Sequence, residues 1–163
     1  MTERPLWAPW RIEYITRPKD AECVFCSASA AHGAEADRVV QRGPRCFTIL
    51  NAFPYAPGHV MVAPHRHVAQ LDELADEELL EMMQQSRSVI RGLREAMSPD
   101  GFNVGLNLGT VAGAGIADHL HLHVVPRWNG DTNFMPLLAD TRVIPQALDA
   151  TREALSAALD RLP

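Results

Sequence analysis

Residues 119–125 read His-Leu-His-Leu-His-Val-Val, and this strict alternation constrains the fold more than any other feature of the sequence. A period of two is typical of a β-strand that has one face in the core. At a strand rise of ~3.3 Å per residue, the imidazoles of His119, His121 and His123 project from one face roughly 7 Å apart. The aliphatic residues between them are predicted to point into the core.

Three aligned imidazoles are costly inside a core, because each would need a hydrogen-bond partner of its own. Three interpretations therefore stay open. The histidines could lie by chance on a solvated strand, or they could be the ligands of a zinc site. In the third interpretation one neutral imidazole is a nucleophile, and its neighbours bind and orient the substrate.

The rest of the chain groups several strand patterns with two helix patterns. Apolar residues recur at three- and four-residue steps over residues 76–97, which predicts an amphipathic helix, and a second helix is predicted over about residues 145–162. The small, polar segment 27–37 is predicted to be a loop. Strands are predicted at residues 38–41, 46–51, 60–63 and 102–108, the last with one face in the core. Because strands and helices do not alternate regularly, the fold class is α+β with an antiparallel sheet.

Length and charge exclude several classes of protein. A chain of 163 residues has the size of one domain and needs neither a metal nor a disulfide to fold. We expect a single domain over 1–163, with an N-terminal arm at 1–37, a core at 38–128 and a C-terminal segment and helix at 129–163. The formal net charge is −5 without a basic run, so no nucleic-acid partner is expected, although backbone N–H groups could still bind a nucleotide. No apolar stretch could cross a bilayer and no signal-peptide pattern is present, so we expect a cytoplasmic protein without a membrane partner.

Cys23 and Cys26 have the C-x-x-C spacing of a metal site or a redox pair. A thioredoxin-like redox pair would open a helix in a βαβ unit, and no such unit is predicted here. A metal site or a metal-free pair is therefore favoured. Cys46 lies in an apolar strand and is predicted to be a core residue.

The segment directly before the histidines, residues 107–116, is rich in glycine. Gly109, Gly113 and Gly115 permit unusual backbone angles, and their N–H groups could point at phosphate oxygens. No Gly-Lys-Ser/Thr follows, and the third glycine of a dinucleotide fingerprint is missing, so this is neither a Walker loop nor a Rossmann loop. A flexible hairpin is the alternative for this segment alone. Next to three histidines, the segment favours a phosphate cradle beside a histidine nucleophile.

Residues 119–127, which end in Val-Val-Pro-Arg, resemble the signature of the histidine-triad (HIT) nucleotide hydrolases and transferases. Residues 6–14, 113–119 and 126–131 are most similar to the bacterial diadenosine tetraphosphate phosphorylases of that family. Three further motifs resemble the family, in the family's order: Cys23-x-x-Cys26 its bacterial zinc half-site, Asn51-x-x-Pro-x-x-Pro-Gly-His59 its upstream loop, and Ala112-Gly113 the start of its phosphate loop.

The resemblance implies the HIT fold, an antiparallel sheet with two packing helices, and assembly into homodimers or tetramers. It also implies that His121 attacks a nucleotide α-phosphorus and forms a nucleotidyl-histidine intermediate. Inorganic phosphate as acceptor would convert diadenosine tetraphosphate into ADP and ATP. Water as acceptor would make the protein a hydrolase of dinucleoside polyphosphates or nucleoside phosphoramidates. A nucleotide-binding protein with negligible turnover is the alternative from another class.

The resemblance also implies roles for further residues of the site. Independently of the resemblance, Arg127 is expected either to neutralise a phosphate or to pair with Asp131. The implied residues are His119, His123 and His59 in the catalytic histidine cluster, Asn51 at the ribose, Asn107 at the phosphate or ribose, the backbone of Gly113, Ala114 and Gly115 at the phosphate, and Trp128 near the nucleotide.

One departure from the family concerns the phosphate loop. Many hydrolases of the family place Gln, Ser or Thr after Ala-Gly as a side-chain donor, whereas this chain has Ala114 and Gly115. One extra residue also precedes the first histidine. The departure argues against an ordinary hydrolase and leaves the phosphate contacts to backbone groups and histidines.

The implied cofactor is a structural zinc ion. In zinc-bearing relatives the other two ligands are a histidine just past the strand that follows the Pro-Gly-His loop and the first histidine of the triad. Two other histidines, His65 and His32, compete for one ligand position, because residues 64–67 read Pro-His-Arg-His. The implied ligands are Cys23, Cys26, His67 and His119.

Overall fold

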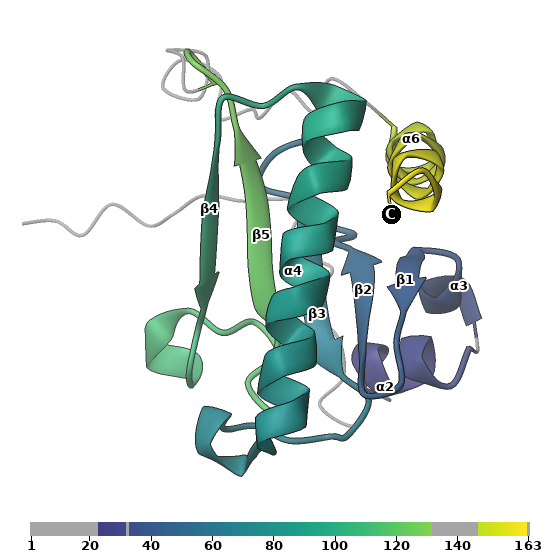
Figure 1. Cartoon of the computed structure of the whole chain (residues 1–163). Helices are drawn as coiled ribbons and strands as arrows, with labels where there is room; N and C mark the ends of the chain where they lie inside the picture. Colours follow the sequence, from purple (N-terminus) through teal and green to yellow (C-terminus); the bar gives the residue numbers. More distant parts are fainter. Residues whose placement is uncertain (1–22, 32, 132–146, 163) are drawn as a thin grey trace, which may run out of the picture.

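The computed structural model of the chain describes residues 23–31, 33–131 and 147–162 (Figure 1). The resemblance at residues 6–14, the competing ligand His32 and the predicted start of the second helix at residue 145 lie outside these residues. Over the part that is described, no helix is both long and apolar enough to cross a membrane.

Five antiparallel strands form one sheet in the order β1-β2-β3-β5-β4. This arrangement confirms the α+β class with an antiparallel sheet. The strands that the sequence predicted begin and end within three residues of those observed. They are β1 (Val39–Arg42), β2 (Cys46–Leu50), β3 (Val60–Pro64), β4 (Gly101–Leu106) and β5 (Leu122–Arg127).

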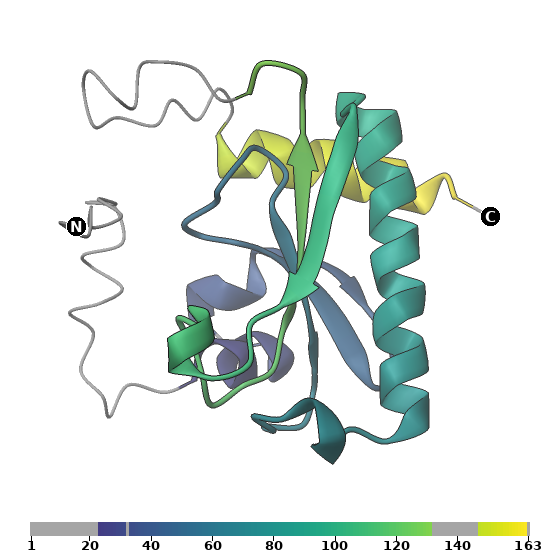
Figure 2. The ribbon, with the colours of Figure 1, turned by 90° about the vertical axis from the view of Figure 1, so that its left-hand side faces the viewer.

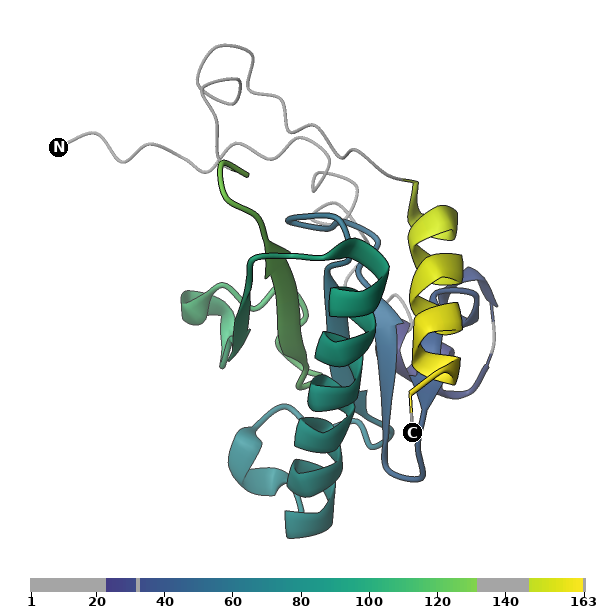
Figure 3. The same ribbon diagram turned by 45° about the horizontal axis from the view of Figure 1, so that its top comes forward.

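One face of the sheet is covered by the long helix α4 (Asp76–Met97), with α6 (Leu148–Asp160) packed against α4 (Figure 3). The sequence predicted the bounds of α4 correctly, because acidic residues open its first turn and Pro99 follows its left-handed C-cap, Ser98. Gly92 lets the two helices approach, since a Cβ there would lie 3.0 Å from the side chain of Leu155. The second helix was predicted to end at about residue 162, and α6 ends at Asp160.

The opposite face carries two short helices, α2 (Val24–Ser29) and α3 (Gly33–Ala36), as Figure 2 shows. The prediction of a loop at residues 27–37 is therefore wrong. Alanine favours helix, and Arg42 completes the C-terminal turn of α2 by donating to the carbonyl oxygens of Ala28 and Ser29. An apolar cluster, separate from the core beneath α4, joins α2 to this face of the sheet. It consists of Phe25 and Ala28 of α2, Phe47 and Ile49 of β2, and Met61 and Ala63 of β3.

Strand β4 lies at the edge of the sheet, and the prediction that one of its faces is in the core holds only in part. Phe102 and Leu106 pack against the main core, but Val104 between them is 45% exposed. The face of β4 and β5 that is turned away from α4 borders a cavity. Among residues 23–31, 33–131 and 147–162, no helix covers this corner of the sheet beside the histidines.

Candidate active site

The three triad histidines alternate with core residues as predicted, but only the last of them lies in strand β5. His119 and His121 precede the strand, which begins at Leu122, three residues later than predicted. Leu120, Leu122 and Val124 join the core beneath α4. The predicted ring spacing of roughly 7 Å is wrong: the ring centroids of His121 and His123 are 4.8 Å apart. The predicted value is the two-residue repeat of a strand backbone, whereas the two side chains lean toward each other in an edge-on contact.

His121 is buried, with 6% of its surface exposed, and its Nδ1 lies 2.8 Å from the backbone carbonyl oxygen of His119. A carbonyl oxygen can only accept, so Nδ1 carries the ring proton and Nε2 keeps its lone pair. Burial lowers the pKa of His121, while the hydrogen bond to the carbonyl acts in the opposite direction. The ring is therefore held as a neutral imidazole with an unprotonated Nε2.

His59 and His123 form a second pair of rings with a defined direction of hydrogen bonding. The backbone N–H of Tyr55 donates to Nδ1 of His59 at 3.1 Å, so Nε2 of His59 carries the proton. That Nε2 lies 2.9 Å from Nδ1 of His123 and donates to it. Nδ1 of His123 is therefore an acceptor, which leaves Nε2 of His123 as the protonated nitrogen, a donor for an anionic oxygen.

The rigid loop at residues 51–59 positions His59. Gly58 has φ +73°, and a Cβ on it would lie 2.8 Å from the side chain of Leu93, so the loop fits against α4 only with glycine there. The side chain of Asn51 accepts the N–H of Phe53 and lies 3.3 Å from Nδ1 of His59. Asn51 thus braces this loop, and its predicted contact with a ribose stays a prediction.

The glycine-rich segment forms a tight loop whose shape depends on two glycines in the left-handed region, Gly109 and Gly113. The N–H of Gly113 donates to the carbonyl of Thr110 at 3.0 Å, and that of Ala114 donates to Gly109 at 3.2 Å. These two N–H groups hold the loop together. The predicted role of donor to a phosphate therefore depends most on the N–H of Gly115.

A cavity of about 1190 Å³ opens beside the histidines along the outer face of β4 and β5. Its walls include three residues that the sequence predicted for the site, His123, Asn107 and Trp128. At its far end Arg127 pairs with the carboxylate of Asp131. Of the two roles expected for Arg127, the structure shows this ion pair.

Two aromatic residues of this region have no role in the sequence analysis. Tyr55 stacks on His59 with 4.9 Å between the ring centroids, and it also lines the cavity. Phe25 contacts His121 with 4.8 Å between the centroids. The available signals were the position of Tyr55 in the proline-rich loop before His59 and that of Phe25 between two cysteines.

Cys23, Cys26, His67 and His119 form a compact cluster whose ligand atoms all lie within 4.8 Å of one another. Nδ1 of His119 is 3.4 Å from Sγ of Cys23, and Nδ1 of His67 is 3.2 Å from Sγ of Cys26. Bond lengths of ~2.1 Å to nitrogen and ~2.3 Å to sulfur around a tetrahedral zinc place such atoms about 3.6 Å apart. The two thiols and two imidazoles therefore fit a structural zinc ion.

The surroundings of His119 support the same assignment. Burial lowers the pKa of His119 to about 4, which keeps the ring neutral, as a metal ligand must be. Its Nε2 donates a hydrogen bond to the carbonyl oxygen of Pro64 at 2.9 Å, so Nδ1 carries the lone pair that can bind the metal. His65, the competing ligand, is engaged elsewhere, with Ser29 and with the carbonyl oxygen of Gly43.

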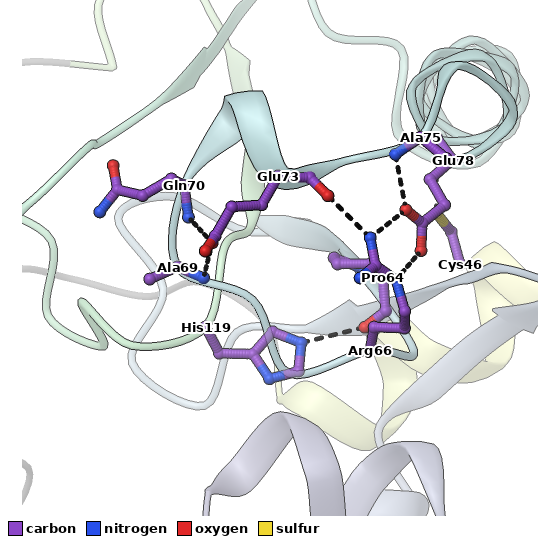
Figure 4. A network of polar contacts seen from close by, with 9 residues as sticks. All are labelled: Cys46, Pro64, Arg66, Ala69, Gln70, Glu73, Ala75, Glu78 and His119. Atoms are coloured by element: carbon purple, nitrogen blue, oxygen red, sulfur yellow. Dashed lines mark hydrogen bonds and ion pairs between the residues drawn. The ribbon is translucent and has the colours of Figure 1, made fainter.

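The segment that carries His67 is held by an ion-pair network, which Figure 4 shows. Arg66 donates to both carboxylate oxygens of Glu78 at 2.8 and 2.7 Å and to the backbone carbonyl of Glu73 at 2.8 Å. Glu78 also accepts the N–H of Ala75 at the start of α4. The Arg66 guanidinium is the main reason why the pKa of Glu78 is lowered to about 2.

Known proteins resemble this chain in sequence and in structure. Residues 33–130 match the HIT domain. A Mycobacterium tuberculosis protein named AP-4-A phosphorylase is 43% identical over an alignment of 166 positions, which covers 97% of this chain and 85% of the relative. A zinc-bound histidine triad family protein from Mycobacterium smegmatis superposes with a TM-score of 0.71 at 28% identity and covers 86% of this chain and 94% of its own.

A more distant structure, a hypothetical histidine triad nucleotide-binding protein from Sulfolobus tokodaii strain7, shows the same fold with a TM-score of 0.68. It is 24% identical and covers 85% of this chain and 92% of its own. The domain match, the relative that spans nearly the whole chain and the arrangement of the three histidines agree. The chain therefore belongs to the histidine-triad family.

Proposed function

We propose that this protein transfers nucleotidyl groups from dinucleoside polyphosphates through His121, and that its main reaction converts diadenosine tetraphosphate and phosphate into ADP and ATP. The observation that carries the proposal is the hydrogen bond from Nδ1 of His121 to the carbonyl of His119. It leaves the lone pair of Nε2 unprotonated, as a nucleophile at phosphorus requires. The relative named AP-4-A phosphorylase supports this choice of substrate.

In the first step, Nε2 of His121 attacks the α-phosphorus, and a new N–P bond forms. The bond between that phosphorus and the oxygen that bridges to the β-phosphorus breaks, and ATP leaves. His123 would donate its Nε2 proton to an oxygen of the transferred phosphoryl group, since its Nδ1 accepts from His59. The enzyme then carries an adenylyl group on His121.

In the second step, an oxygen of inorganic phosphate attacks the same phosphorus. The N–P bond breaks, His121 regains its lone pair, and ADP leaves. Ala114 and Gly115 provide no side-chain donor in the phosphate loop, which favours phosphate over water as acceptor. Attack by water instead would release AMP and make the protein a hydrolase, the second candidate function.

The proposal includes a zinc ion held by the two cysteines with His67 and His119. Zinc with four protein ligands has no open coordination position, so it would fix the structure and not act on the substrate. Since His119 is assigned to this cluster, its expected role in catalysis reduces to offering its carbonyl oxygen to His121. A homodimer or tetramer and a cytoplasmic location also stay predictions.

Product analysis tests the proposal. The purified protein is incubated with diadenosine tetraphosphate with and without inorganic phosphate, and the nucleotides are separated by ion-exchange chromatography. ADP and ATP that form only with phosphate support the proposal. AMP and ATP without phosphate support the hydrolase, and the absence of cleavage in both cases favours a nucleotide-binding protein.

A further inference from the structure

The side chain of Phe25 connects the cysteine pair to the proposed nucleophile. Phe25 lies in the first turn of α2, between Cys23 and Cys26, and has no exposed surface. Its ring centroid is 4.8 Å from that of His121 with 33° between the ring planes, and 5.1 Å from that of His119. One fully buried ring thus contacts both histidines.

Helix α2 is too short to be stable alone, so its place depends on its tertiary contacts. Near its start, Cys23 and Cys26 belong to the metal cluster. At its end, the hydroxyl of Ser29 lies 2.7 Å from Nδ1 of His65, and Arg42 donates to the carbonyl of Ala28 at 2.6 Å. Phe25 is therefore carried by a segment that is fixed at both ends.

The hydrogen bond to His119 fixes the tautomer of His121 but leaves the tilt of the ring to its packing. Among the described residues, the rings of Phe25 and His123 pack against it, each with 4.8 Å between centroids. The proposed role of His123 is to contact the phosphate. Phe25 has no polar group, so it acts on the His121 ring through packing. An attacking atom must lie about 3–3.5 Å from phosphorus, and a misplacement of ~1 Å can cost about 100-fold in rate.

We propose that Phe25 is a positioning residue for His121: its ring, carried between two ligands of the metal cluster, holds the imidazole in the attacking orientation. The metal cluster and the nucleophile are thereby coupled through one side chain. This proposal rests on the proposed function of His121, and it adds a role for α2 in the transfer step. A merely structural Phe25 would contribute to stability but not to kcat.

The test compares Phe25→Leu with a matched control, Phe47→Leu. Both rings are fully buried in the same cluster, but the ring contacts of Phe47 are with Phe25 and His65. Both variants should lose similar stability and keep the metal content of the parent protein. Only Phe25→Leu should lower kcat, by about tenfold or more, with KM changed less than about threefold. Equal kcat values for the two variants would overturn the proposal.

A second readout does not depend on turnover. Nitrogen-15 spectra of the histidine rings, recorded on metal-loaded protein, should show His121 as a single sharp Nδ1–H form in the parent and in Phe47→Leu. In Phe25→Leu the same signals should broaden or split, and a sharp parent-like signal would contradict the proposal. If Phe25→Leu does not fold, the pair Phe25→Met and Phe47→Met replaces it, because methionine fills more of the volume.

The two proposals can fail separately. If His121→Ala turns over diadenosine tetraphosphate like the parent, the proposed function fails, while the ring spectra still decide whether Phe25 orders His121. If His121→Ala is inactive and Phe25→Leu has the kcat of Phe47→Leu, the proposed function stands and the positioning role is rejected.

Discussion

The imidazole of His121 donates its Nδ1 proton to the backbone carbonyl of His119, 2.8 Å away, and the side chain of His119 belongs to the metal cluster. His119 therefore has two roles: its ring is part of the metal cluster, and its backbone carbonyl orients the proposed nucleophile. The position of the His119 carbonyl depends on the ring, which is fixed by Cys23 and by the carbonyl of Pro64. Substitutions that displace His119 are therefore expected to affect both metal binding and catalysis.

Replacing His121 by alanine should abolish turnover, with a loss of at least about 1000-fold in kcat, because the proposed N–P bond forms on Nε2 of this residue. Nucleotide binding should survive, since the cavity along β4 and β5 does not include His121 among its lining residues. Initial rates and calorimetric titration with ADP measure the two effects. A variant that keeps more than a tenth of the parent activity would contradict the role of His121.

Replacing His59 by phenylalanine should lower kcat by about 10- to 100-fold, the usual cost of losing a group that orients a catalytic side chain. The variant removes the Nε2 donor of His59, so the hydrogen bond that fixes the tautomer of the His123 ring is lost. Steady-state kinetics with diadenosine tetraphosphate check this. An unchanged kcat would show that His123 is oriented by other contacts.

Metal content should be one zinc per chain, measured by elemental analysis of the purified protein. His67→Ala should lose most of it, because it removes one of four ligands. His65→Ala is the matched control: this histidine is two residues away, but it contacts Ser29 and Gly43 instead of the cysteines. Equal zinc contents in the two variants would exclude His67 as a ligand.

Both His65 and His67 satisfied the sequence pattern for the metal site, and spacing alone could not choose between them. The choice depends on where α2 lies, and that helix was not predicted, because residues 27–37 have the composition of a loop. The alternation at residues 119–125 and the stripe of α4 were predictable, because each pattern reports one face packed on the core. Contacts between distant segments, such as Phe25 with His121, carry no such local signal.

Cys46 should resist alkylation at pH 8 in the folded protein. Its thiol is fully buried, and burial, followed by the charge of Glu81, raises its pKa to about 12, so the reactive thiolate is absent. Peptide mapping after iodoacetamide treatment should find Cys46 modified only after denaturation. Modification at the rate of a free thiol in native protein would contradict this.

Stability should depend on pH through Glu78. The pKa of Glu78 is lowered from 4.5 to about 2, so its contribution is complete above about pH 4.5 and is lost as the pH falls toward 2. Glu78→Gln should cost about 1–2 kcal/mol at pH 7. Urea unfolding at pH 7 and pH 3 should show a smaller difference between the two pH values for the variant than for the parent.

The matched control for that prediction is Glu77→Gln, because Glu77 is an exposed carboxylate in the same first turn of α4. It should keep the pH dependence of the parent. If Glu78→Gln also keeps it, the ion pair with Arg66 does not couple protonation to folding.

The central claim, a nucleotidyl group carried on His121, is tested most directly by trapping the intermediate. The protein is mixed with diadenosine tetraphosphate without inorganic phosphate, quenched at alkaline pH to preserve the N–P bond, and analysed by intact-mass and peptide mass spectrometry. The account predicts a mass increase of one adenylyl group, located on the peptide that contains His121, which disappears with formation of ADP when phosphate is added. Turnover of the same sample without any such adduct, or an adduct on another residue, would contradict the account.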